Sequence, residues 1–124
     1  MFERIVIVTK KTALDDLLAR FHSFGQVEFF LQSRGTSIDE YKEADTTYKL
    51  ALAQILGSLP EGVPRHQLPR EHIANFLFRE TDLVIAVGPD GLFVNVAKYL
   101  DGQPILTVNP DPTRIDGVLM LHRP

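Results

Sequence analysis

The chain of 124 residues lacks cysteine, so it can form neither a disulfide framework nor a thiolate metal site, which fits the reducing cytoplasm. It also lacks an excess of positive charge: its net charge is −3, which argues against a nucleic-acid partner. No apolar run approaches the ~18 residues of a membrane span, and residues 1–4 carry no apolar secretory region. These absences predict a soluble cytoplasmic domain that binds neither membranes nor nucleic acids.

Common phosphate and metal motifs are missing as well. The first apolar run is not followed by G-x-G-x-x-G, and no G-x-x-x-x-G-K-[ST] occurs, so the ordinary dinucleotide and P-loop fingerprints are excluded. Lysines follow that run, where a flavodoxin-like phospho-acceptor domain would need acidic residues. We predict no metal site made by the protein, because the histidines lie far apart without zinc-ligand spacing: His22, His66, His72 and His122.

The most informative stretch is residues 82–95. Residues 83–87 are continuously apolar, rich in β-branched side chains and too short for a helix, which predicts a strand buried on both faces. The turn-forming run Gly88-Pro89-Asp90-Gly91 ends the strand, and the apolar residues of 92–100 favour a short buried helix. A strand, a glycine turn and a helix present backbone N–H groups to a phosphate in open α/β sheets.

The rest of the chain follows an α/β pattern. Residues 5–8, 27–31 and 104–108 are predicted to be strands, and residues 63–67 a short edge strand. With the strand at 83–87, this order predicts a Rossmann-like, three-layer open parallel sheet of about five strands with helices on both faces.

Caps and apolar spacing indicate three further helices. Thr12 and Asp15 predict a capping box for the first, which we expect to end at Gly25. Ser37 predicts the N-cap of a second helix of about five turns, by the 3.6-residue repeat. Its Tyr41 and Tyr48 could face a ligand, but packing against the sheet is the simpler expectation. The third is expected to begin near Pro69 and to bury Ile73, Phe76 and Leu77.

Ligands in open parallel sheets bind at the carboxyl ends of the strands, where the strand order reverses. We predict that residues 5–8 and 83–87 are adjacent parallel strands, because both are continuously apolar and both end in candidate ligand loops. The point of reversal then brings Lys10 and Lys11 beside Gly88–Gly91. A cationic pair and a glycine turn in one crevice would suit a nucleotide phosphate. Taken singly, each lysine is more simply interpreted as a solvated side chain.

Two segments resemble the NAD kinase family. Residues 82–92 (DLVIAVGPDGL) resemble the strand and GGDGT loop of that family, and residues 103–114 (QPILTVNPDPTR) are similar to the strand and V-N-x-D-P-x-R run of its mitochondrial-type branch and bacterial relatives. The two segments have the family's order and separation, so the resemblance covers nearly the whole chain. Pro89 and Leu92 stand where the family has glycine and threonine, which leaves fewer donors for a phosphate.

The resemblance implies an enzyme that phosphorylates the 2′-hydroxyl of the adenosine ribose of NAD. It implies ATP or polyphosphate as phosphoryl donor, Mg²⁺, and a homo-oligomer when the protein is full length. The family's catalytic carboxylate maps to Asp90, and Asn95 is the candidate replacement for the missing donor. The residues predicted to bind nucleotide or phosphate are Gly88, Gly91, Leu92, Asn95, Lys10, Lys11 and Asn109.

The resemblance also implies a domain division. Residues 1–108 would form the N-terminal α/β domain, and residues 109–124 would begin the crossover to a second, β-rich domain with an N-E/D motif and most of the dinucleotide contacts. We expect that second domain to lie outside these residues, so the chain alone should be inactive. Two alternatives stay open: a non-catalytic nucleotide-binding or regulatory module on the same fold, and a lipid or sugar kinase of the same superfamily.

Overall fold

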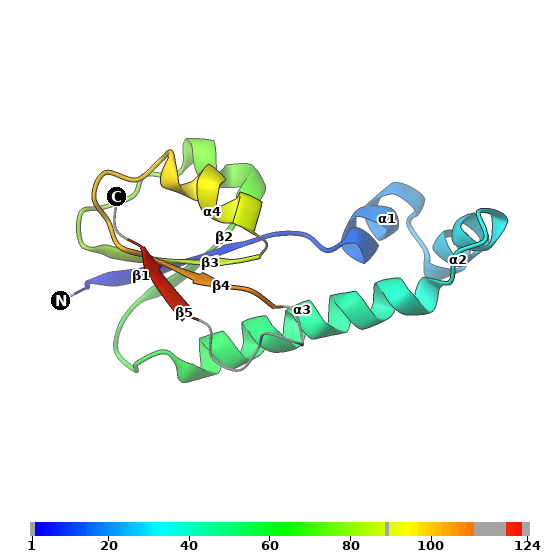
Figure 1. The fold of residues 1–124 in the computed structure, drawn as a ribbon, viewed down its shortest axis with the longest axis horizontal. Coiled ribbons are helices and arrows are strands. Elements are labelled where there is room, and N and C mark those ends of the chain that lie inside the picture. The colour runs from blue at the N-terminus through cyan, green and yellow to red at the C-terminus, as the bar shows by residue number, and fades with distance from the viewer. Residues whose placement is uncertain (1, 89, 111–118, 123–124) are drawn as a thin grey trace.

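The computed structural model describes residues 2–88, 90–110 and 119–122, which form a five-stranded sheet with helices on both faces (Figure 1). The strand order is β2-β1-β3-β4-β5. The first four are parallel and β5 is antiparallel to β4, so the α/β class is confirmed, but the parallel part has four strands rather than about five. The strands are β1 (Arg4–Thr9), β2 (Arg65–Pro69), β3 (Asp82–Val87), β4 (Ile105–Val108) and β5 (Leu119–His122).

The helices divide between the two faces of the sheet. In Figure 1 the second half of the long helix α3 runs along one face, whereas α4 and the short 3₁₀ helix η1 cover the other. Among the described residues, no helix combines the length and the apolar character needed to cross a membrane. The helical elements are α1 (Ala13–Phe21), α2 (Phe24–Ser33), α3 (Ile38–Ser58), η1 (Arg70–Asn75) and α4 (Asp90–Ala97).

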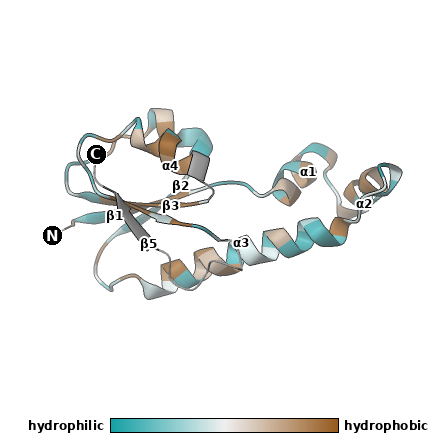
Figure 2. Cartoon of the chain, in the orientation of Figure 1, coloured by the Kyte–Doolittle hydropathy of each residue, from teal (hydrophilic) through white to brown (hydrophobic). Residues whose placement is uncertain are grey.

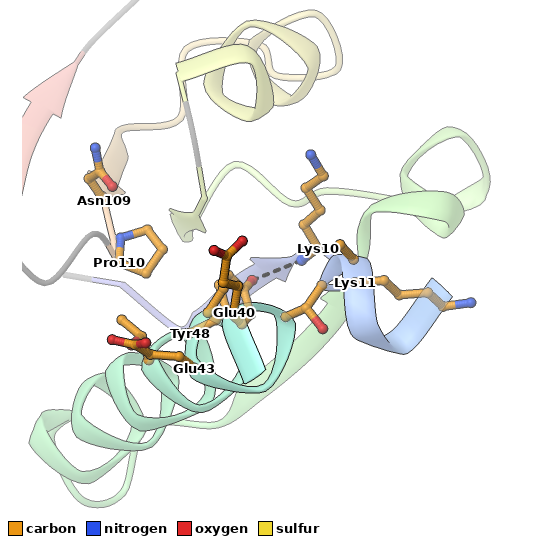
Figure 3. Close-up of a pocket in the computed structure, with 11 residues that line it drawn as sticks. Lys10, Lys11, Glu40, Glu43, Tyr48, Asn109 and Pro110 are labelled. Carbon is orange, nitrogen blue, oxygen red and sulfur yellow. Dashed lines mark hydrogen bonds between the residues drawn. The ribbon is translucent and has the colours of Figure 1, made fainter. Parts of the chain in front are cut away.

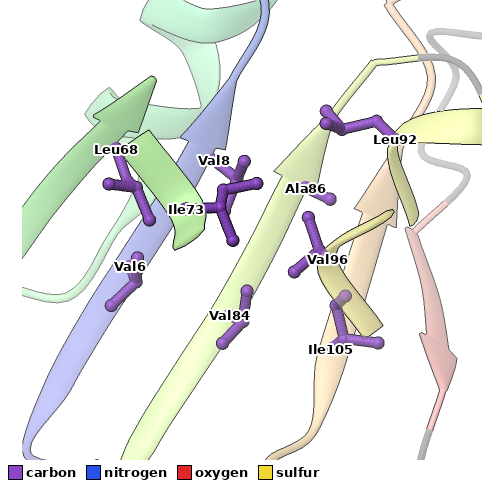
Figure 4. Close-up of a cluster of buried hydrophobic side chains, with 9 residues drawn as sticks. All are labelled: Val6, Val8, Leu68, Ile73, Val84, Ala86, Leu92, Val96 and Ile105. Carbon is purple, nitrogen blue, oxygen red and sulfur yellow. The ribbon is translucent and has the colours of Figure 1, made fainter. Parts of the chain in front are cut away.

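The adjacency of β1 and β3 is confirmed, and the two strands form the centre of the core. They pair in parallel from Arg4 opposite Asp82 to Val8 opposite Ala86. Side chains alternate across the sheet: Val6 and Val8 face η1 and α4 (Figure 4), while Ile5 and Ile7 face α3. All four are buried, as continuous apolar runs in a parallel sheet predict.

The predicted strand at residues 27–31 is wrong, because this segment lies in helix α2. Val27 and Leu31, one turn apart, are buried, whereas Phe29 is 75% exposed, so the run has one buried face and not two. Gly25 does not end the preceding helix: α1 ends at Phe21, its C-cap residue His22 adopts φ 68°, and Gly25 lies inside α2. The side chain of Ser23 caps α2 by accepting from the Gln26 N–H, and this spacing is a signal that sequence reasoning missed.

Helices α1 and α2 pack with the first part of α3 as a cluster away from the sheet (Figure 1). The predicted capping box of Thr12 and Asp15 is confirmed at the start of α1. Tyr41 belongs to this cluster, so the expectation that it packs against the sheet is wrong. Hydrophilic and hydrophobic residues alternate along α3 in Figure 2, as expected for a helix that buries its apolar side chains and exposes its polar ones.

The region between α3 and β3 follows its prediction in part. β2 is an edge strand, but it runs from Arg65 to Pro69 rather than over residues 63–67. η1 follows Pro69 and buries Ile73, and Phe76 packs against the same cluster. Leu77 is 83% exposed, so its expected place in the core is wrong.

A buried ion pair fixes the amino ends of β1 and β3. Arg4 donates from Nε to Asp82 Oδ1 at 2.8 Å and from Nη2 to Oδ2 at 2.7 Å. The Asp82 side chain is fully buried and also accepts from the Arg79 N–H at 2.8 Å. Burial by itself raises the pKa of Asp82, but the hydrogen bonds from Arg4 and Arg79 outweigh it and lower that pKa overall.

We expect Asp82→Asn to lower the free energy of unfolding near neutral pH by about 3 kcal/mol, as for other broken buried ion pairs. Because folding lowers the pKa of Asp82, this stabilisation is fully present above its unfolded pKa of about 3.9 and is lost as pH falls through the folded pKa. Urea unfolding from about pH 7 to about pH 3 should therefore show that the difference in the free energy of unfolding between wild type and variant becomes smaller below about pH 4.

A suitable control is Lys49→Met, which removes exposed ion pairs to Asp15 and Asp45 and should cost less than about 1 kcal/mol. The role assigned to the buried pair would be contradicted if the two variants lost equal free energies of unfolding, or if the loss for Asp82→Asn did not change with pH.

Candidate functional site

The strand order reverses between β1 and β3. From β1 the chain passes through α1, α2 and α3 to β2 on one side, and from β3 it passes through α4 to β4 on the other. The carboxyl ends of β1 and β3 are therefore the position at which an open parallel sheet binds ligands. Lys10 follows β1, and Gly88 and the start of α4 follow β3 at the same edge.

A hollow of about 540 Å³ opens at this edge, on the α3 side (Figure 3). This volume is within the range of small-molecule sites, which is roughly 300–1,000 Å³. Three segments make its wall: the loop from β1 into α1, the first half of α3, and the residues after β4. The lining residues are Lys10, Lys11, Thr12, Ala13, Glu40, Glu43, Ala44, Thr47, Tyr48, Asn109 and Pro110.

The two lysines differ in direction and in partner. In Figure 3 the Lys10 side chain points away from Glu40 and Glu43, toward the α4 side of the sheet. Its ammonium has no ion-pair partner among the described residues. The Lys11 ammonium points away from the hollow and lies 3.8 Å from Glu71 Oε2, so of the two lysines it is Lys10 whose ammonium has no ion-pair partner in the described part of the chain.

The hydroxyl of Tyr48 joins α3 to the ends of both central strands. It accepts from the Lys10 N–H at 2.9 Å and donates to the Val87 carbonyl oxygen at 2.8 Å. The ring packs against the core on the α3 face, so the prediction that Tyr48 packs against the sheet is confirmed. Burial is the main cause that raises the pKa of Tyr48, which keeps the hydroxyl protonated and able to donate.

The loop after β3 is fixed by the sheet and by α4. The Gly88 N–H donates to the Val108 carbonyl oxygen at 3.0 Å, so it is engaged in the sheet. The Leu92 side chain is 2% exposed and belongs to the core (Figure 4), so only the backbone of Leu92 can contact a ligand. That backbone lies in the first turn of α4, where N–H groups have no partner within the helix.

The other predicted site residues are only partly brought together. Asn109 lines the hollow with Lys10 and Lys11. Asn95 is half-buried in the second turn of α4 and does not line it. Asp90 and Gly91 begin α4, and their side chains lie outside the described part of the structure, as does Pro89. The predicted crevice therefore has two parts: the start of α4 above the sheet edge and the hollow on the α3 side.

Sequence reasoning missed the α3 wall of the hollow. The wall residues on α3 recur at spacings of three and four, which places them on one face of the helix. An apolar pattern cannot reveal this face because most of its members are polar or small: Glu40, Glu43, Ala44, Thr47 and Tyr48. Among the described residues, no group of three or more histidine, aspartate or glutamate side chains could hold a metal ion.

No model of a known protein family matches the chain, and a search of curated proteins finds no match. The similarity of residues 82–92 and 103–114 to NAD kinases therefore stays a prediction from the sequence. The geometry at the carboxyl edge of the sheet is an independent basis for inferring function.

Gly88 should be required for packing. A Cβ atom at this position would lie 2.8 Å from Leu92 Cδ2, inside a buried cluster, so we expect Gly88→Ala to lower the free energy of unfolding by about 1–3 kcal/mol through overpacking. The control Gly57→Ala adds a methyl group with nothing within 4 Å on helix α3 and should stabilise by about 0.5–1 kcal/mol. Chemical denaturation measures both, and a neutral Gly88→Ala would contradict the close packing.

Proposed function

We propose that this chain is the nucleotide-binding α/β domain of an NAD-kinase-like phosphotransferase, which transfers a phosphoryl group from ATP or polyphosphate to the 2′-hydroxyl of the adenosine ribose of NAD. The observation that carries the proposal is the adjacency of β1 and β3 at the reversal of strand order. It brings Lys10 and the loop that resembles the family's diagnostic motif to one edge of the sheet.

Charge separates this edge into two regions. Lys10 directs its unpaired ammonium toward the α4 side, where α4 also begins. A cation and a helix N-terminus both favour phosphate, the first by its charge and the second by its dipole and unpaired N–H groups. Phosphate groups of the nucleotide therefore belong on the α4 side of the edge.

The hollow on the α3 side suits the uncharged part of a nucleotide. Glu40 and Glu43 contribute carboxylates to its wall, and these would repel a phosphate. Carboxylates and hydroxyls, such as that of Thr47, are instead good partners for ribose hydroxyls. A donor nucleotide such as ATP that spans the edge would place its own ribose in the hollow and its phosphates beside Lys10.

Asp90 is the carboxylate that this arrangement offers for chemistry, because it begins α4 at the same edge. In the proposed reaction it holds the 2′-hydroxyl of the acceptor, the adenosine ribose of NAD, in position and takes its proton. Mg²⁺, which the resemblance implies, is commonly held by substrate phosphates with only one or two protein carboxylates. The lack of a ready-made group of metal ligands among the described residues is compatible with that arrangement.

A second candidate function is a nucleotide-binding module without catalysis. Two observations favour it: the Gly88 N–H is engaged with Val108, and Leu92 directs its side chain into the core. Both reduce the donors that the loop can offer to a transferring phosphoryl group. Binding by Lys10 and the start of α4 is unaffected by either, so the two candidates differ in turnover and not in nucleotide binding.

Binding can be tested on the chain itself by isothermal titration with ATP. Lys10→Ala should raise Kd by about tenfold or more, because it removes a charge-assisted contact to phosphate. Lys11→Ala is the matched control: its ammonium lies near Glu71, and the Kd should stay within about twofold. Equal effects of the two substitutions would contradict the assigned phosphate position, and a wild-type chain that binds neither ATP nor NAD⁺ would contradict both candidate functions.

Catalysis requires the residues together with the second domain that the resemblance implies. In that protein Asp90→Asn should lower kcat by roughly 10²–10⁴, the range for a positioned acid–base group. The control Asp101→Asn changes an exposed aspartate that also precedes a glycine and should leave kcat unchanged. NADP formation from NAD and ATP measures both. No turnover by the unsubstituted protein, despite nucleotide binding, would favour the non-catalytic module.

A further inference from the structure

The pairing of β1 with β3 ends one residue before the end of each strand. Its last registered pair is Val8 with Ala86, and continuing this register would pair Lys10 with Gly88. The Ile5 N–H donates to Pro64 on the β2 side, so the even-numbered residues of β1 direct their N–H groups toward β3. The next bond of a continued ladder would therefore run from the Lys10 N–H to the Val87 carbonyl oxygen.

The Tyr48 hydroxyl occupies the place of that bond. It accepts from the Lys10 N–H at 2.9 Å and donates to the Val87 carbonyl oxygen at 2.8 Å, so one oxygen atom bridges the two groups that would otherwise meet directly. The strands are thus held apart by one hydroxyl at the point where the strand order reverses.

We propose that Tyr48 is a positioning residue: its hydroxyl keeps the carboxyl ends of β1 and β3 apart and so sets Lys10 and the loop after Gly88 to receive a nucleotide. The inference rests on the proposed function, because it assigns the residue that prepares that site. Tyr48 holds the protein groups that bind the nucleotide and takes no part in the chemistry.

The environment of Tyr48 fits this role. Its ring is half-buried against the α3-side core, which includes Ile7, Ile85 and Val87, and this packing fixes the direction in which the hydroxyl points. The next residue, Lys49, bonds to Asp15 on α1 and to Asp45 on α3, which ties this part of α3 to the segment that follows β1.

Loss of the hydroxyl has two structural outcomes. The Lys10 N–H and the Val87 carbonyl can bond directly, which closes the ladder by one step and draws Lys10 toward Gly88. Alternatively, the two groups remain apart and form hydrogen bonds with water in place of the Tyr48 hydroxyl. In both cases the binding groups lose the arrangement they hold before a ligand arrives, and a ligand must restore it at the expense of affinity.

The test compares Tyr48→Phe with Tyr41→Phe, a matched control on the same helix. Tyr41 is half-buried in the α1–α2 cluster, and its hydroxyl has no hydrogen bond among the described residues. Each ¹⁵N-labelled variant of the chain is titrated with ATP and, separately, with NAD⁺. The measurements are Kd, the amide shifts of Lys10 and Gly88, the hydrogen exchange of the Lys10 amide, and the melting temperature.

We expect Tyr48→Phe to shift both amide resonances and to raise the ATP Kd about tenfold, while Tyr41→Phe changes neither. A Tyr48→Phe chain that binds ATP within about twofold of wild type would overturn the positioning role, even if its melting temperature falls, because the hydroxyl would then be structural only. An unprotected Lys10 amide in the wild-type chain would also overturn it, and this measurement needs no variant. If the wild-type chain binds neither ATP nor NAD⁺, the proposed function fails and the inference fails with it.

Discussion

The parallel pairing of β1 with β3 is the interaction on which the rest of the structure depends, and different groups secure its two ends. At the amino end, Arg4 and the fully buried Asp82 lock the strands together through two short hydrogen bonds. At the carboxyl end the Tyr48 hydroxyl bridges Lys10 and Val87. Because the ion pair fixes the register at the amino end, the two strands do not need to stay paired at the carboxyl end, where the candidate site lies.

The same pairing separates the chemistry of the two faces. Because side chains alternate along a strand, Val6 and Val8 face α4, and Lys10 continues in that direction beyond the end of β1 (Figure 3). The carboxylates of Glu40 and Glu43 come from α3 on the opposite face. The cation thus points to the α4 side, whereas the two anions are supplied by α3, and this division, rather than a glycine-rich fingerprint, gives the edge its polarity.

The sequence predicted the centre of the fold better than its periphery. Strands β1 and β3 are buried on both faces, so their apolar runs carry an unambiguous signal. Val27–Leu31 was ambiguous, since a short apolar run fits a buried strand as well as a helix. The decisive information was local, in the cap from Ser23 to Gln26, and tertiary, in the cluster that buries Val27 and Leu31.

The candidate site shows the same limit. Lys10 and Lys11 could be predicted to lie at the carboxyl edge because they follow a strand of the sheet, but that Asn109 lines the hollow with them was not predicted. The different directions of the two lysines could not be predicted, since a sequence does not reveal that Glu71 lies near Lys11. The role of Tyr48 was also beyond reach: an aromatic residue on a helix predicts packing, and its hydroxyl acquires meaning only from the register of two strands.

Helix α3 holds the loop between β1 and α1 at two points, and this loop forms part of the wall of the hollow. Before α1, the Lys10 N–H is held by Tyr48, and at the start of α1 the Thr12 hydroxyl donates to Asp45. Asp45 lies less than one turn before Tyr48 on α3, so one short stretch of helix holds the loop at two points. A loop held twice by a packed helix keeps its shape without a ligand, and the hollow is accordingly a feature of the folded chain and does not depend on binding to form.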